Sequence, residues 1–290
     1  MTYKQENNNI IITNLNHFDI DEILDSGQCF RYEQMGEKEY IIIAHNKVLV
    51  VKQIKTEIIL YNITLEEYET IWHKYFSFDD DYENIKNTLS SKDDIIREAI
   101  NYAPGVRILK QDLWEMIITF ILSANNNIKR IKHGVLQISE KYGEIIDEIN
   151  GVKYYNFPTP ELLCKATVEE LHSLKIGFRD KYIVDACIKV ASGEVNLKNL
   201  VNMTTSDAKE ELLKIKGIGN KVADCILLFG LHRYEVFPTD TWIRKVMISL
   251  YIKKDVKLDE ITKYALEHFG ENASYAQQYL FHYARKNKIS

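Results

Sequence analysis

Lys221 and Asp240, in the last third of the chain, carry the two side chains best suited to chemistry on a sugar carbon. A neutral primary amine can attack such a carbon and form a Schiff base, and a carboxylate can stabilise an oxocarbenium-like sugar. Lys221 falls in the first turn of a predicted helix, where the helix dipole disfavours a cation. We therefore expect burial and the helix end to lower the pKa of its ammonium group.

Each member of this pair also has an ordinary structural explanation. A lysine taken alone is more often a solvated surface side chain than a nucleophile. Asp240 follows Pro238-Thr239 and precedes Thr241, a pattern typical of a helix N-cap. Capping and catalysis are compatible roles for one carboxylate.

Gly217 and Gly219 stand just before the helix that is predicted to begin near Asn220. Glycine permits a tight turn and a close backbone approach, and the free N–H groups of a helix start attract anions. Apolar residues within 212–215 and 222–228 would pack the two flanking helices together. A Gly-x-Gly pattern alone is more typical of a plain helix–helix turn than of a phosphate site.

The elements that must position these residues differ between the two parts of the chain. Residues 9–63 contain β-branched runs typical of strands, at 10–13, 40–44, 48–51 and 57–61, with a hairpin turn predicted around His45–Lys47. From Thr64 the apolar residues recur with helical period, starting with Leu65, Tyr68, Ile71, Trp72 and Tyr75.

From Ser91 onward the sequence predicts almost only helices. Three helix starts are predicted from capping patterns: Ser91 with Asp94, Asp112 ahead of the apolar run 113–122, and Thr159 before Pro160. The run 113–122 is apolar on nearly every side, so we expect it at the centre of the helical part.

The composition is that of a soluble globular protein of one or two domains, with 290 residues, 46% hydrophobic and 27% charged. No apolar run reaches the roughly 18 residues of a membrane span, and the N-terminus lacks a signal-peptide region. We expect an intracellular protein with no membrane partner. The four cysteines, Cys29, Cys164, Cys187 and Cys225, form no Cys-x-x-Cys pair, so no zinc site or cluster is predicted.

The net charge of −5 at first disfavours a nucleic-acid partner, but the charge is unevenly distributed. Acidic residues gather in 79–94, whereas 125–133 and 213–246 carry an excess of lysine and arginine. Two locally basic segments on an acidic molecule fit binding to a few DNA phosphates. Ordinary solvated faces are the alternative explanation.

The hairpin with Lys221 and Asp240 resembles the signature of the helix-hairpin-helix DNA glycosylase superfamily. Four further segments narrow the resemblance to 8-oxoguanine DNA glycosylases with lyase activity: Ser26-Gly27-Gln28-Cys29-Phe30-Arg31, residues 122–130, Gly177-Phe178-Arg179 and residues 275–281. The resemblance extends along the chain from about Asn14 to Arg285. Some superfamily members carry an iron–sulphur loop near the C-terminus, but this chain has no cysteine after Cys225.

The resemblance implies an α+β fold, with an N-terminal antiparallel β-sheet domain over residues 1–90 and a helical helix-hairpin-helix domain over 91–290. The base pocket would lie between them. In the catalytic roles that it implies, Lys221 attacks C1′ of the damaged nucleoside and Asp240 stabilises the sugar. The resulting Schiff base permits β-elimination of the 3′ phosphate.

The resemblance also assigns residues to DNA recognition. For the flipped base, the Gly27 carbonyl accepts the N7–H that only 8-oxoguanine has, Gln277 reads the Watson–Crick edge, and Phe281 and Cys225 sandwich the ring. For the opposite strand and the phosphates, the implied residues are Asn125, Arg130, Phe178, Arg179, Gly217 and Gly219. Phe178 replaces a family tyrosine, and Trp242 replaces a histidine of the animal and fungal members, which puts cytosine preference and one phosphate contact in doubt.

The partner implied is double-stranded DNA containing 8-oxoguanine, bound by a monomer in a bacterial or archaeal cell interior. No cofactor is implied, although backbone carbonyls at the hairpin could hold a monovalent or divalent cation. Two other functions are considered: a glycosylase for an alkylated or deaminated base, and a non-catalytic DNA-binding module that uses only the hairpin.

Overall fold

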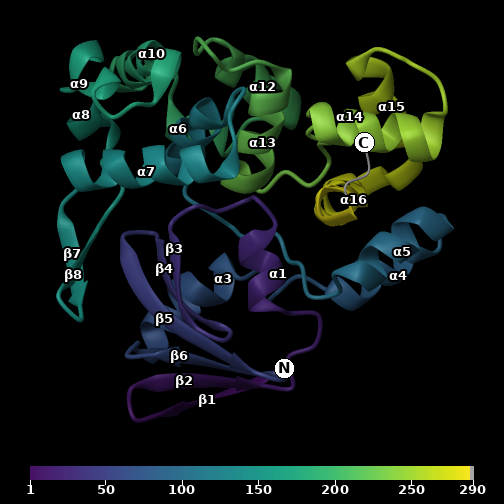
Figure 1. The fold of residues 1–290 in the computed structure, drawn as a ribbon, viewed down its shortest axis with the longest axis horizontal. Helices are drawn as coiled ribbons and strands as arrows, with labels where there is room; N and C mark the ends of the chain where they lie inside the picture. The colour runs from purple at the N-terminus through teal and green to yellow at the C-terminus, as the bar shows by residue number, and fades with distance from the viewer. Residues whose placement is uncertain (288–290) are drawn as a thin grey trace.

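The computed structural model describes residues 1–287. A six-stranded antiparallel sheet forms the N-terminal part, and helices form a layer above it (Figure 1). The strand order is β1-β2-β6-β5-β4-β3. The strands are β1 (Thr2–Glu6), β2 (Asn9–Thr13), β3 (Tyr32–Gly36), β4 (Glu39–Ala44), β5 (Lys47–Ile54) and β6 (Glu57–Tyr61). This arrangement confirms the predicted α+β fold class.

The sheet follows the alternation of its sequence. In β5, Leu49, Val51 and Gln53 point into the core, while the residues between them are more exposed. His45 and Asn46 both have positive φ values, 49° and 59°, which is the backbone of a tight two-residue hairpin turn, as predicted. Strands β1 and β3 were not predicted, because they are mostly polar edge strands with little buried surface.

One face of the sheet is covered by α1 (Ile20–Asp25) and by a continuous helical stretch made of α2 (Leu65–Glu67), a π-helical segment (η1, Tyr68–Trp72) and α3 (His73–Tyr75). Tyr68, Trp72 and Tyr75 are buried as expected, but Leu65 is exposed. The apolar face therefore begins one turn later than its period predicts.

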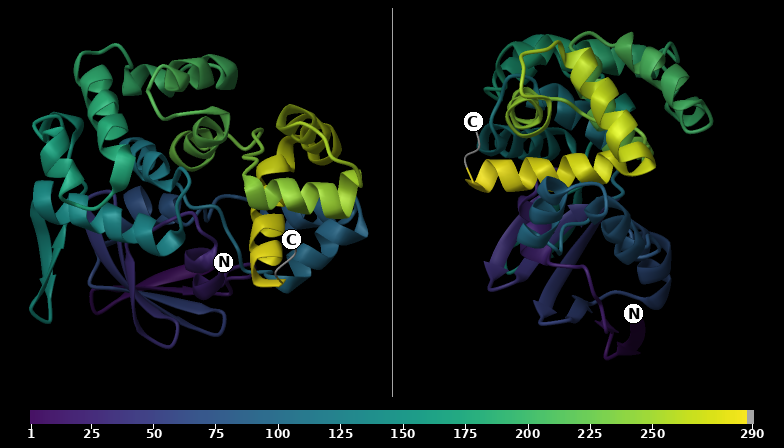
Figure 2. Two further views of the ribbon diagram at one scale, coloured as in Figure 1. Left: turned by 45° about the horizontal axis from the view of Figure 1, so that its top comes forward. Right: turned by 90° about the vertical axis from the view of Figure 1, so that its right-hand side faces the viewer.

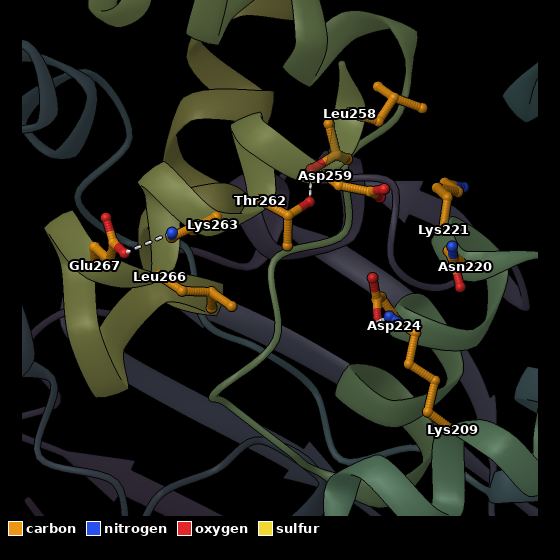
Figure 3. Close-up of a pocket in the computed structure, with 11 residues that line it drawn as sticks. Lys209, Asn220, Lys221, Asp224, Leu258, Asp259, Thr262, Lys263, Leu266 and Glu267 are labelled. Carbon is orange, nitrogen blue, oxygen red and sulfur yellow. Dashed lines mark hydrogen bonds and ion pairs between the residues drawn. The ribbon is translucent and has the colours of Figure 1, made fainter. Parts of the chain in front are cut away.

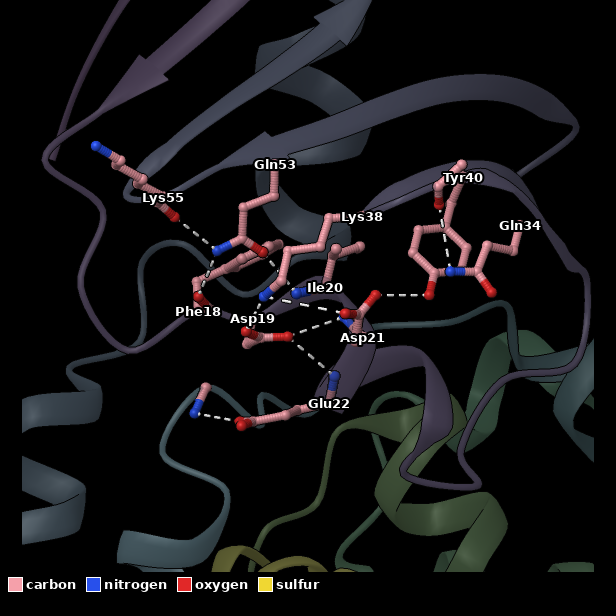
Figure 4. Close-up of polar contacts among 12 residues, drawn as sticks. Phe18, Asp19, Ile20, Asp21, Glu22, Gln34, Lys38, Tyr40, Gln53 and Lys55 are labelled. Carbon is pink, nitrogen blue, oxygen red and sulfur yellow. Dashed lines mark hydrogen bonds and ion pairs between the residues drawn. The ribbon is translucent and has the colours of Figure 1, made fainter.

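Helix α1 is fixed to the sheet at its start (Figure 4). The Gln53 side chain accepts from the Ile20 amide at 2.8 Å and donates to the Phe18 carbonyl at 3.0 Å. Tyr40 donates to Asp21 at 2.6 Å, and Lys38 pairs with the capping carboxylate of Asp19. These contacts therefore fix the start of the helix that leads into residues 26–31.

The helical part comprises α4 (Tyr82–Ser90), α5 (Asp94–Tyr102), α6 (Leu113–Ser123), α7 (Ile128–Tyr142), α8 (Pro160–Leu163), α9 (Val168–His172), η2 (Gly177–Arg179), α10 (Asp180–Ala191), α11 (Leu197–Leu200), α12 (Thr205–Leu213), α13 (Asn220–Leu231), α14 (Thr241–Val246), η3 (Met247–Ile252), α15 (Leu258–Phe269), η4 (Gly270–Asn272) and α16 (Ala273–Asn287). None of these helices within residues 1–287 is long and apolar enough to cross a bilayer.

Helix α6 lies at the centre of the helical core, as predicted. Asp112 caps it by accepting from the Glu115 amide at 2.9 Å, and Phe120 stacks on Phe229 of α13 at 5.4 Å. Thr159 also caps its helix ahead of Pro160. The predicted cap at Ser91 is wrong.

Asp93 caps α5 instead of Ser91, and accepts from the Ile96 amide at 2.8 Å. Ser91 still has helical φ and ψ and ends α4, whereas Asp93 has the extended backbone that an N-cap requires.

A second hairpin interrupts the helices, so the expectation of almost only helix after Ser91 is wrong. Strands β7 (Ile145–Ile149) and β8 (Val152–Tyr155) turn at Asn150-Gly151. Tyr154 packs on Ile41 and Ile43, on the outer face of the sheet. The Asn-Gly dipeptide was the available signal for this hairpin.

The molecule has two main cores. The right-hand view of Figure 2 shows most of the helices as a layer above the sheet. The sheet core draws on residues between Ile10 and Phe78 together with Leu109. The helical core includes α4 and α5, which pack against α16. A boundary at residue 90, between α4 and α5, stays a prediction.

Candidate active site and DNA-binding groove

Lys221 and Asp240 line one groove, of about 600 Å³, on the helical layer. Lys221 lies half-buried in the first turn of α13, directly after the glycine hairpin. Its ammonium nitrogen is 5.6 Å from the centre of the Phe120 ring. The two residues that the sequence singled out, 19 positions apart, thus face the same space.

Asp240 is the N-cap of α14, as predicted. One carboxylate oxygen, Oδ1, accepts from the Ile243 amide at 2.8 Å. The other, Oδ2, has no hydrogen-bond donor among residues 1–287. The cap therefore fixes the orientation of the carboxylate and leaves one oxygen for a substrate.

Cys225 is buried one helical turn after Lys221. Burial raises the pKa of its thiol to about 11, although Lys221 acts in the opposite direction and Asp240 adds to the rise. At neutral pH the thiol is uncharged, and it presents a soft, apolar wall beside the amine.

A second hollow, of about 420 Å³, lies on another side of Lys221 and is bounded by α15 (Figure 3). Asp224 lines it, buried, and pairs with Lys209 at 2.7 Å. Burial raises the pKa of Asp224, and its hydrogen bond with Lys209 counteracts the rise. This ion pair joins α12 to α13, the two helices of the hairpin.

The glycines of the hairpin have different roles. Gly217 has φ +87°, and a Cβ there would lie 2.5 Å from the Tyr182 ring, so no other residue fits without movement. Gly219 is the N-cap of α13 and has open space where a side chain would be. The amides at the start of α13 are therefore accessible to an anion such as a phosphate.

Asn125, in the loop between α6 and α7, and Arg130, in the first turn of α7, line the same groove as Lys221. Asn125 has φ +50°, and Asn127 caps α7 by accepting from the Arg130 amide at 3.0 Å. The structure thus places both predicted opposite-strand residues beside the predicted catalytic pair.

Arg179 is only 4% exposed and is bonded to the backbone of that loop. It donates to the carbonyls of Ala124 at 3.0 Å, Asn125 at 2.8 Å and Ile176 at 3.0 Å. In this state it supports the Asn125 loop. Phe178 is 52% exposed beside it, with its ring centre 4.5 Å from the Arg179 guanidinium carbon, and is free to contact DNA.

The proposed base-reading residues meet at the contact between the turn after α1 and the last helix. Gly27 has φ +82°, and a Cβ there would lie 3.1 Å from Phe281. Gln277, one turn before Phe281 on α16, is 6% exposed, and its side-chain oxygen has no partner among residues 1–287. The sandwich of a base between Cys225 and Phe281 stays a prediction.

Two residues of the groove, Thr239 and Arg244, were not among the predicted site residues. Trp242, at the position of the family histidine, also lines the groove and is partly exposed, with Lys245 5.8 Å from its ring centre. The position of Arg244 in the first turn after the Asp240 cap was the available signal.

Within residues 1–287, no group of three or more His, Cys, Asp or Glu side chains could hold a metal ion.

Comparisons with known proteins agree with this arrangement. Residues 10–117 match the family model of the 8-oxoguanine DNA glycosylase N-terminal domain. Residues 118–271 match the model of the HhH-GPD superfamily of base excision DNA repair proteins. The structure of the Clostridium acetobutylicum 8-oxoguanine glycosylase/lyase, in complex with double-stranded DNA containing cytosine opposite 8-oxoguanine, has a TM-score of 0.96. It is 40% identical, over 100% of this chain and 99% of that one.

Two curated relatives are more distant. The probable N-glycosylase/DNA lyase of Methanothermobacter thermautotrophicus is 29% identical over 77% of this chain and 76% of its own length. The DNA-3-methyladenine glycosylase of Bacillus subtilis is 26% identical over 97% of this chain and 99% of its own length. The chain belongs to the HhH-GPD superfamily of base excision DNA repair proteins, and an N-terminal domain of the 8-oxoguanine DNA glycosylase type precedes its catalytic domain.

Proposed function

We propose that this enzyme removes 8-oxoguanine from duplex DNA and then nicks the strand at the abasic sugar. The observation that carries the proposal is the shared groove of Lys221 and Asp240, which places an amine and a carboxylate on one substrate-sized space. A binding module that used only the hairpin would need neither group.

In the first step, the neutral amine of Lys221 attacks C1′ and the bond from C1′ to the base breaks. The base leaves with the bonding electrons and takes up a proton. The free oxygen of Asp240 stabilises the positive charge that develops on the sugar. The nitrogen then loses a proton and forms the C1′=N bond of an iminium ion as the C1′–O4′ bond breaks. O4′ leaves with the bonding electrons and takes up a proton, which opens the sugar ring.

In the second step, the iminium ion makes the hydrogens on C2′ acidic. Loss of one C2′ proton expels the 3′ phosphate, which leaves with the electrons of its C–O bond. Water then hydrolyses the Schiff base and frees Lys221. Beside the amine, the Cys225 thiol stays uncharged at neutral pH because burial raises its pKa.

Recognition of the lesion rests on two acceptors. The Gly27 carbonyl accepts no hydrogen bond from residues 1–287 and can take the N7–H of 8-oxoguanine. The buried, unpartnered oxygen of Gln277 can accept from the N–H groups on the Watson–Crick edge. Guanine lacks the N7–H and would leave the Gly27 carbonyl unpaired, at a cost of about 1–3 kcal/mol.

On the opposite strand, Asn125 and Arg130 fill the space left by the flipped base, and Phe178 wedges into the stack. Arg179 completes recognition of cytosine by exchanging some of its bonds to the carbonyls of the Asn125 loop for bonds to the base. The amides at Gly217 and Gly219 hold a phosphate. No cofactor takes part. A cation at the hairpin would be held by backbone carbonyls.

One monomer supplies every residue of this proposal. Its substrate places the enzyme in the compartment that contains the DNA.

Borohydride reduction of the Schiff base tests the proposal. We expect the wild-type protein to form a covalent adduct with an 8-oxoguanine duplex, because reduction converts the iminium into a stable amine. Lys221→Gln should abolish the adduct, with Lys216→Gln in the same hairpin as the matched control. Undiminished trapping by the Lys221 variant would contradict the assignment.

The Bacillus relative favours a second candidate, a glycosylase for alkylated bases. A 3-methyladenine has no N7–H for the Gly27 carbonyl, so the Gly27–Gln277 arrangement supports the first candidate. A panel of duplexes with 8-oxoguanine, 3-methyladenine and uracil distinguishes them by the rate of base release.

A further inference from the structure

We propose that α16 positions the Gly27 turn, and that Arg285 and Gln278 with their partner Asp25 are positioning residues for lesion recognition. The inference rests on the proposed function, since it concerns how the Gly27 carbonyl is held where it can read N7–H. None of these three side chains belongs to the catalytic pair.

Three side chains of α16 fasten the turn to the helix. Gln278 donates to the Ser26 carbonyl at 3.1 Å. Arg285 donates to the Asp25 carbonyl and pairs with the Asp25 carboxylate at 3.0 Å. Lys286 pairs with the other oxygen of that carboxylate. The turn is therefore held from one helix face along two helical turns.

The backbone carbonyls of residues 25–28 differ in whether they accept a hydrogen bond. Those of Asp25 and Ser26 accept from α16, and that of Gln28 accepts from the Gln111 side chain at 2.8 Å. Among residues 1–287, the Gly27 carbonyl is the member of this run without a donor. Its neighbours on both sides are fixed, so its direction is fixed as well, and it remains open to a ligand.

The same arginine also supports the stacking residue. The Arg285 guanidinium carbon lies 5.8 Å from the centre of the Phe281 ring, and its side chain is only 18% exposed. Phe281 in turn lies against Gly27. One side chain thus contacts both the turn that reads N7–H and the ring predicted to stack on the base.

This support is needed because Gly27 itself is conformationally free. Its positive φ and missing Cβ allow the peptide to rotate at little cost. At its start α1 is anchored to the sheet by Gln53, Lys38 and Tyr40. Beyond its end, the turn is held by α16 and by Gln111, and Arg285 is the α16 side chain that contacts both the turn and Phe281, so its removal loosens the turn and the stacking ring together.

The test compares two reactions of one protein. Excision of 8-oxoguanine needs the base pocket, whereas cleavage of a preformed abasic site needs only Lys221 and the groove. We expect Arg285→Met to lower the single-turnover excision rate about tenfold, because charge-assisted hydrogen bonds are lost. Abasic-site cleavage should stay within about twofold of wild type. Arg285→Lys should restore part of the excision rate, since it keeps the charge.

Tyr283→Phe is the matched control, because it removes a hydrogen bond from the same helix, to Glu98 at 2.6 Å, on a different face. It should leave both reactions unchanged. Asp25→Ala gives a second, milder variant in case the arginine variant folds poorly, and should reduce excision in the same selective way.

Equal excision by wild type, Arg285→Met and Asp25→Ala would overturn the inference, as would a parallel fall of both reactions. If wild-type protein cleaves abasic sites but never releases 8-oxoguanine, the proposed function fails instead.

Discussion

Cys225 shows how a single side chain is set by its surroundings. It lies beside a lysine, which alone would favour the thiolate, yet burial dominates and raises the pKa of the thiol from 9.0 to about 11. A cysteine next to an amine is therefore not a nucleophile here. Its contribution is shape and low polarity.

The raised pKa predicts slow alkylation of Cys225. At pH 8 the native protein should react with iodoacetamide at Cys225 far more slowly than the guanidinium-unfolded protein, because the thiol is protonated and buried. Because the folded-state value is the higher one, this group favours folding fully below about pH 9, and that contribution is lost as the pH rises to about 11.

Mass spectrometry of the labelled peptides measures the reaction, and the half-buried Cys164 serves as an internal reference. Rapid labelling of Cys225 in folded protein at pH 8 would contradict the prediction.

At the scale of elements, the hairpin depends on one cross-helix ion pair. Lys209 on α12 and Asp224 on α13 are 15 residues apart in sequence, and the glycine turn brings them within 2.7 Å. The pair links α12 to the part of α13 that carries Lys221, three residues before Asp224.

We expect Lys209→Ala to lower the free energy of unfolding by about 1–2 kcal/mol, less than the ~3–5 kcal/mol of a fully buried pair, because Lys209 is partly exposed. Asp224→Asn in that background should recover part of the loss, since the amide needs no counter-charge. Urea unfolding measures both. Lys263→Ala, which removes a surface pair with Glu267 at 3.8 Å, is the control and should cost well under ~1 kcal/mol. A Lys209→Ala protein as stable as wild type would rule out this role.

Local patterns were sufficient to predict much of the fold and the site. Capping at Asp112, Thr159 and Asp240, the start of α13 and four of the sheet strands follow from neighbouring residues alone. The sequence also predicted that Lys221 and Asp240 lie together, as they do in one groove, because their residue types and the glycine hairpin occur in one segment; their catalytic roles stay a prediction.

Contacts between distant segments could not be predicted. The attachment of α16 to the Gly27 turn joins residues about 260 positions apart, and the engagement of Arg179 with the Asn125 loop depends on tertiary packing. The β7–β8 hairpin was missed because its helical surroundings dominated the interpretation. The residue types in the sequence thus predicted the kind of reaction. The contacts that hold the site residues in place depend on tertiary structure and could not be predicted.

On the scale of the whole molecule, charge distribution matters more than net charge. The chain carries −5 overall, yet Arg130, Lys221 and Arg244 all line the groove. A duplex that lies there would release counterions from a few phosphates.

Binding to duplex DNA should therefore weaken steeply with salt. Between 50 and 200 mM NaCl we expect the affinity to fall about tenfold or more. Fluorescence anisotropy with a labelled duplex measures this effect, and replacing chloride with glutamate at one cation concentration controls for anion effects. An affinity that does not change over this range would exclude binding through phosphate contacts in the groove.

The β7–β8 hairpin joins the two halves of the molecule through α7. That helix starts beside Arg130 in the groove and ends near the hairpin, which lies on the outer face of the sheet. Arg31, in the segment that follows Gly27, donates to the Tyr155 carbonyl of β8. Any tilt of the sheet relative to the helices would therefore also displace α7 and, with it, Arg130 in the groove.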